Sequence, residues 1–90
     1  MNNKEINLLR EKVDSLDNKI IALLDERLKL SLNIALEKQK NNLNIYDKNR
    51  EINIIDRLKK LKKNYLSNNA IEKIYKEILN NSVTEMEKYK

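Results

Sequence analysis

Two long cationic side chains, Arg27 and Lys38, flank the apolar segment "LKLSLNIAL". If this part of the chain is helical, eleven residues make three turns plus about 20°, so both cations lie on one face with Cα atoms roughly 16 Å apart. Two such side chains leaning toward each other could bracket a small dianion. The alternative is that both cover apolar surface with their stems or pair with acids. Arg27 falls on the apolar, core-facing stripe of this helix. Because burying an unpaired arginine is costly, Arg27 needs an acidic partner or an anionic ligand.

A second group of polar residues lies in "YDKNREI" and in the last part of the chain. Asp47 is an acceptable helix N-cap, and Arg50 and Glu51 follow it in what would be the first turn. The alternative interpretation is a capped helix with a local Arg–Glu pair. Ser82 falls on an apolar stripe, where a lone serine usually bonds a carbonyl one turn back, so by itself it indicates little.

Arg10 is a further cation of interest, in "LLREKVDSLD". It precedes Arg27 by seventeen residues, roughly 25 Å along a helix, which is too far to share a small-molecule site within one chain. If two copies of the helix pair antiparallel, Arg10 of one copy can approach the Arg27–Lys38 region of the other.

One long helix must carry these three cations. Apolar residues step by alternating threes and fours, a seven-residue repeat typical of a packed helix, and no breaker interrupts the chain before Lys40. The strand-like alternation of "LKLSLNIAL" is therefore embedded in a helix, predicted from about Asn3 to about Asn41. The repeat comprises Ile6, Leu9, Val13, Leu16, Ile20 and Leu23.

The predicted length of this helix implies a partner. Nearly forty residues at 1.5 Å per residue span roughly 55–60 Å, whereas a compact chain of this size spans only about 30 Å. The remaining fifty or so residues cannot cover the helix, so the simplest partner is a second copy in a two-fold dimer.

The absence of Gly and Pro favours an all-α fold of three helices in a single domain over residues 1–90. Asparagine is the residue left for positive φ, and it clusters in the two expected connections. The second helix is predicted to start near Asp47 and the third near Asn68 or Asn69. The side chains expected to point inward are Ile54, Ile55, Leu58, Leu61 and Tyr65 on the second helix, and Ile71, Ile74, Tyr75, Ile78, Leu79 and Val83 on the third.

Composition excludes several kinds of chemistry. The chain has no Cys and no His, which removes disulfides, thiol nucleophiles, ordinary zinc sites and imidazole acid–base catalysis; we expect neither metal nor cofactor. The net charge is +5 with interspersed acids, so the basic run "LKKLKK" is better interpreted as a solvated helix face than as a nucleic-acid contact. With no apolar span and no signal core, we expect a cytoplasmic, soluble protein without membrane contact.

The ordered set of motifs resembles the all-helical class of chorismate mutases over nearly the whole chain. The set consists of "LLREKVDSLDNKIIALLDER", Lys38 eleven residues after Arg27, "YDKNRE", and "NNSV" in the last helix. Each piece is a weak motif, and the specificity lies in the order and spacing. The resemblance implies an intertwined homodimer of three-helix chains with two equivalent active sites that convert chorismate to prephenate, without metal or cofactor.

The resemblance also implies roles for individual residues. Arg27 and Arg10 of the second copy would clamp the two carboxylates of chorismate, and Lys38 would contact a carboxylate and the ether oxygen. Asp47, through its backbone, and Glu51 would contact the ring hydroxyl. Arg50 would support the wall of the site, and Ser82 would contact a carboxylate. The reaction is a concerted intramolecular shift, which requires no nucleophile or general base but needs a held substrate shape and positive charge at the ether oxygen.

The chain departs from the family pattern at Met86. The family usually has Gln, or sometimes Glu, four residues after the serine, where it donates a second hydrogen bond to the ether oxygen. Met86 can donate none, and losing such a donor typically costs about 100- to 1000-fold in rate. Three interpretations stay open: a slow mutase, a shifted last helix that brings Glu85 or Glu87 inward, or a vestigial activity.

Other functions remain as alternatives. An isochorismate–pyruvate lyase on the same scaffold would also need clustered cations. A non-catalytic helical dimerisation or regulatory module is supported mainly by the Met86 departure. A nucleic-acid-binding helical dimer is favoured only by charge, and strong salt-dependent binding would indicate it.

Overall fold

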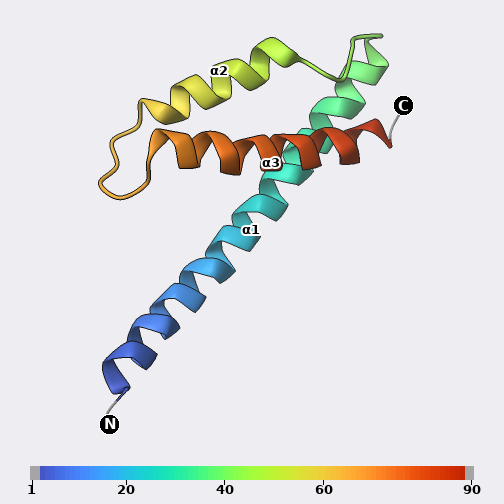
Figure 1. Cartoon of the computed structure of the whole chain (residues 1–90). Helices are drawn as coiled ribbons and strands as arrows, with labels where there is room; N and C mark the ends of the chain where they lie inside the picture. The colour runs from blue at the N-terminus through green and yellow to red at the C-terminus, as the bar shows by residue number, and fades with distance from the viewer. Residues whose placement is uncertain (1–2, 89–90) are drawn as a thin grey trace. The chain divides into compact units, whose positions relative to one another are not determined.

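The computed structural model describes residues 3–88 and contains three helices (Figure 1). Helix α1 covers Lys4–Lys40, α2 covers Lys48–Lys59 and α3 covers Asn68–Glu87. No strand is present among the described residues. The all-α prediction is confirmed, and "LKLSLNIAL" lies within α1, so its strand-like alternation does not indicate a strand. None of the helices in this part of the chain is long and apolar enough to cross a membrane.

The chain divides into two compact units, Met1–Leu30 and Ser31–Lys90, with the boundary inside α1. In the described part of the first unit, the seven-residue repeat forms an apolar stripe whose members are each between 49% and 63% exposed. These members are Ile6, Leu9, Val13, Leu16, Ile20 and Leu23. A stripe of this size leaves apolar surface uncovered within the single chain.

Helix α1 ends in a Schellman motif built on asparagine. Asn42 has a φ of 57°, the left-handed conformation that usually requires glycine and that asparagine tolerates. The Asn42 amide donates to the Gln39 carbonyl at 3.2 Å, and the Leu43 amide donates to the Lys38 carbonyl at 2.8 Å. These bonds satisfy carbonyls at the helix end and turn the chain back at Leu43. The predicted use of asparagine at a positive φ is confirmed here.

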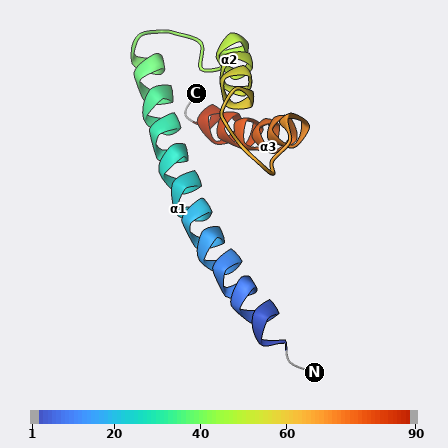
Figure 2. The same cartoon turned by 90° about the vertical axis from the view of Figure 1, so that its left-hand side faces the viewer.

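Helices α2 and α3 form an antiparallel pair within the second unit, side by side in both views (Figure 1 and Figure 2). The Asp47 carboxylate caps α2 by accepting from the Arg50 amide at 3.0 Å, as predicted from the sequence. The Ser67 hydroxyl caps α3 by accepting from the Ala70 amide at 3.0 Å. The third helix therefore begins at Asn68, as predicted.

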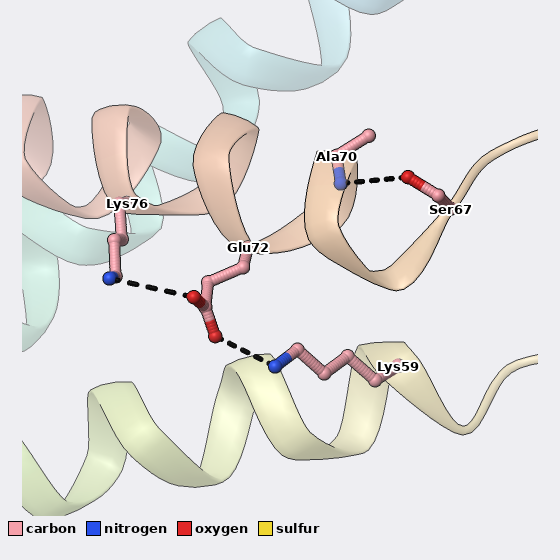
Figure 3. Close-up of polar contacts among 5 residues, drawn as sticks. All are labelled: Lys59, Ser67, Ala70, Glu72 and Lys76. Atoms are coloured by element: carbon pink, nitrogen blue, oxygen red, sulfur yellow. Dashed lines mark hydrogen bonds and ion pairs between the residues drawn. The ribbon is translucent and has the colours of Figure 1, made fainter.

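A carboxylate on α3 ties the two helices together (Figure 3). Glu72 pairs with Lys59 of α2 at 2.7 Å and with Lys76, one turn along α3, at 3.6 Å. The hydrogen bond from Lys59 and then its charge lower the pKa of Glu72, and Lys76 adds to the effect. This ion triad links the C-terminal turn of α2 to the first turns of α3.

The buried side chains of the second unit form a small core. Ala35 near the end of α1, Ile45 in the following loop and Met86 near the end of α3 form one cluster, with Leu32 packed against it. Ile54, Ile71 and Leu79 are also buried. Buried positions on both α2 and α3 agree with the inward faces predicted for them.

Three of the side chains predicted to point inward are exposed instead. Helix α2 ends at Lys59, and the Leu61 amide donates to the Leu58 carbonyl in a tight final turn. Leu61 and Tyr65 therefore lie in the loop, where Leu61 is 53% exposed and Tyr65 is fully exposed. Ile74 on α3 is also about half exposed. For Leu61 and Tyr65 the prediction is wrong because the apolar periodicity continues past a helix end that the sequence does not mark.

Candidate active site

Lys38 is held at the point where α1 meets the loop that follows it. Its ammonium donates to the Ile45 carbonyl at 3.2 Å, and its own carbonyl accepts from the Leu43 amide. Ala35, three residues earlier on the helix, is fully buried and contacts the Ile45 side chain in the core cluster. Packing and hydrogen bonds thus fix both the backbone and the ammonium group of this half-buried lysine.

Lys38 and Asp47 line a common hollow with a volume of about 380 Å³. The remaining lining residues are Leu43, Asn44, Tyr46, Lys48 and Asn49. Most of them come from the loop between α1 and α2, so the Schellman turn and the Asp47 cap together shape this hollow. Besides Asp47, the lining includes two lysines and two asparagines, whose ammonium and amide groups can attract an anion by charge and hydrogen bonds.

Glu51 lies one turn into α2, is half-buried, and lines a second hollow of about 180 Å³ between α2 and α3. Its Oε1 accepts a hydrogen bond from the Tyr46 hydroxyl at 3.4 Å. Arg50 is exposed, and its amide rather than its guanidinium makes the bond to Asp47. No Arg50–Glu51 ion pair occurs among the pairs found in the described chain, which disfavours the local-pair alternative.

Ser82 and Met86 are one turn apart on α3 and both are buried. The Ser82 hydroxyl donates to the Ile78 carbonyl at 3.0 Å, as expected for an inward serine. Met86 is only 8% exposed and belongs to the apolar cluster with Ala35 and Ile45.

Helix α3 runs through Glu87 and keeps Met86 inward. Glu85 and Glu87 are both less buried than Met86. Glu85 pairs with Lys88 at 3.0 Å. The structure therefore disfavours a shifted helix that would replace Met86 by a glutamate.

Arg10 and Arg27 belong to the unit of residues 1–30. Arg10 is exposed and Arg27 is half-buried. Their placement against Lys38, α2 and α3 stays a prediction from the sequence.

The sequence patterns did not single out Tyr46 as a candidate site residue. It lines both hollows and contacts Glu51 through its hydroxyl. Desolvation, then the negative charge of Glu51 and the hydrogen bond to it, raise the pKa of Tyr46. The available signal was its place immediately before the helix cap in "YDKNRE", since the residue before a cap often turns back over the first helical turn.

Fold and site together define an all-helical protein with a small hollow, lined by two lysines and Asp47, at the α1–α2 loop. Comparison with known proteins gives the family: a protein-family model described as chorismate mutase type II matches residues 9–87 of the sequence. The chain belongs to the type II chorismate mutase family.

Solved chorismate mutases have the same fold. The structure of chorismate mutase form II from Thermus thermophilus matches with a TM-score of 0.91 and 30% identity, over 93% of this chain and 96% of that one. Chorismate mutase from Helicobacter pylori, in complex with prephenate, matches with a TM-score of 0.86 and 35% identity, over 92% of this chain and 90% of that one.

A curated relative is considerably longer. The bifunctional chorismate mutase/prephenate dehydratase of Buchnera aphidicola subsp. Schizaphis graminum is 40% identical over 80 residues, which is 88% of this chain. The chain spans about a fifth of the length of that relative (21%).

Proposed function

We propose that this chain catalyses the rearrangement of chorismate to prephenate. The observation that carries the proposal is the hollow shared by Lys38 and Asp47, in a chain that belongs to the type II chorismate mutase family. Prephenate is the product of the proposed reaction, and the Helicobacter pylori neighbour is a complex with it.

In the proposed reaction the C–O ether bond of chorismate breaks while a C–C bond forms within the same molecule. Negative charge develops on the ether oxygen as the bond lengthens, and the Lys38 ammonium is suited to stabilise it. Held by the Ile45 carbonyl and the end of α1, this ammonium loses little conformational freedom when substrate binds. Glu51 and the Asp47 backbone would bind the ring hydroxyl, and Ser82 a carboxylate; Arg50 would support the wall.

The proposal includes a homodimer in which each site is shared. Arg27 of one copy and Arg10 of the other would bind the two carboxylates of chorismate. The exposed apolar stripe on α1 supports this part, because a second copy could cover it. Sedimentation at micromolar concentration would test the dimer, and a monomer there would contradict it. A cytoplasmic location stays a prediction from the sequence, and cell fractionation would test it.

The direct test of the activity is chorismate disappearance followed by absorbance, comparing the wild type with Arg27→Ala. Loss of a carboxylate clamp should lower kcat/KM by about 100-fold or more. Lys29→Ala is a matched control, because Lys29 is an exposed cation two residues away on the same helix. Activity that survives Arg27→Ala unchanged would refute the site assignment, and absence of turnover in the wild type would refute the function.

A further inference from the structure

We propose that Tyr46 is a positioning residue that holds the Glu51 carboxylate for the ring hydroxyl of the substrate, an inference that rests on the proposed function. The pair is direct, since the Tyr46 hydroxyl donates to Glu51 Oε1 at 3.4 Å. An orienting bond to one carboxylate oxygen leaves the other free to accept from a substrate hydroxyl.

The position of Tyr46 in the chain suits this role. It lies between the buried Ile45 and the Asp47 cap of α2. The backbone on either side is therefore held, by the core cluster before it and by the helix cap after it. Tyr46 is about half exposed (49%), so burial of the residue does not by itself account for its contact with Glu51.

Tyr46 also joins the two hollows. It lines the larger one with Lys38 and Asp47, and the smaller one with Glu51. Among the described residues, Lys48 is the only other one common to both linings. Tyr46 would thus lie between a substrate bound beside Lys38 and the hollow that contains Glu51. In that position it can influence how Glu51 contacts the substrate.

Two lysines share the lining of the smaller hollow with the Tyr46–Glu51 pair. Lys48 lines both hollows, and Lys76 of α3 lines the one that contains Glu51. The pKa of Tyr46 is raised by desolvation, by the Glu51 charge and by their hydrogen bond. A tyrosine that keeps its proton remains a donor at neutral pH, which the positioning role requires.

The first experiment measures the pair without any substrate. NMR of 13Cζ-labelled tyrosine follows each hydroxyl through its titration, and Tyr46→Phe assigns the signal. In Glu51→Gln the titration of Tyr46 should move to lower pH, because the carboxylate charge that opposes deprotonation is gone. An unchanged titration would overturn the pairing.

The second experiment is a double-mutant cycle on chorismate turnover. Tyr46→Phe should lower kcat/KM by roughly three- to tenfold, mainly through KM, because a ground-state contact is weakened. In the Glu51→Gln background the same change should have less than about a twofold effect, since the two residues act as a unit. If Tyr46→Phe lowers kcat/KM by the same factor in the wild-type and Glu51→Gln backgrounds, Tyr46 acts independently of Glu51 and the positioning role is overturned.

The control is Tyr65→Phe, the same chemical change at the fully exposed tyrosine of the α2–α3 loop. It should leave kcat and KM unchanged. If the wild type does not turn over chorismate, the proposed function fails and the positioning role fails with it. The NMR titration needs no substrate, so it would still show whether Tyr46 and Glu51 interact even if the wild type does not turn over chorismate.

Discussion

The Lys38 ammonium donates to the Ile45 carbonyl, while the Ile45 side chain is buried with Ala35 and Met86. Ile45 therefore connects Lys38 to the apolar core: its carbonyl accepts from the lysine ammonium, and its side chain is buried in the core cluster. The same hydrogen bond restricts both the Lys38 side chain and the loop that follows α1. This contact makes Lys38 the best-defined cation of the proposed site.

Lys38→Met should separate catalysis from stability. Methionine keeps most of the length and apolar contact of the stem but removes the charge and the bond to Ile45. We expect kcat/KM to fall by about 100- to 1000-fold, with a loss of stability of about 1 kcal/mol for the missing hydrogen bond. Chorismate turnover and urea unfolding measure the two effects. Lys40→Met, at an exposed lysine, should change neither appreciably; comparable losses in both variants would contradict the special role of Lys38.

Met86→Gln should raise turnover by about tenfold or more, because glutamine at this position can donate to the ether oxygen. The gain should come with a loss of stability. Met86 is buried against Ala35 and Ile45, and an amide without a partner there costs about 1–3 kcal/mol in the absence of substrate.

Steady-state kinetics and thermal unfolding of the same Met86→Gln preparation test both parts. Glu85→Gln places the same side chain one position earlier on α3 and should not raise turnover. A rate equal to or below that of the wild type would argue that position 86 does not face the ether oxygen.

Mixing two inactive variants tests whether the sites are shared. Arg10→Ala and Arg27→Ala should each be inactive alone. In a refolded equal mixture, half of the dimers combine both chains, and each of these has one intact site. About a quarter of the wild-type activity should therefore return. A mixture as inactive as its components would contradict a site that takes Arg10 from the second copy.

Glu72 should make stability fall in acid. Its pKa is lowered from the ordinary 4.5, first by the hydrogen bond from Lys59 and then by the charge of that lysine. The unfolded chain therefore binds the proton more readily. The contribution of Glu72 is present above about pH 4.5 and is lost as the pH falls through the lowered pKa of the folded state.

Urea unfolding between pH 7 and pH 3 measures this effect. Glu72→Gln should be less stable than the wild type at pH 7, and the difference should shrink toward pH 3. Glu77→Gln, at an exposed glutamate on the same helix, should follow the wild-type profile. A constant difference between Glu72→Gln and the wild type at all pH values would contradict an electrostatic role for the Lys59–Glu72–Lys76 triad.

Local rules account for the elements that the sequence predicts correctly. The seven-residue repeat and the lack of a breaker define α1, Asp47 marks the start of α2, and Asn42 takes the positive φ that ends α1. Each of these depends on residues within a few positions of one another. The same holds for Ser82, whose hydroxyl bonds the carbonyl one turn back.

Contacts that depend on the path of a loop between helices could not be predicted in this way. The Lys38–Ile45 bond and the Lys59–Glu72 bridge depend on how the loops and helices fold back, which no periodicity specifies. The exposure of Tyr65 follows from an unmarked helix end at Lys59. The residue types and their spacing therefore determined the helices, the family resemblance and the candidate cations. Only the tertiary structure decided which carbonyl accepts from Lys38, because that depends on the path of the α1–α2 loop. It also decided that Met86 lies in the core, because that depends on packing between segments far apart in the chain.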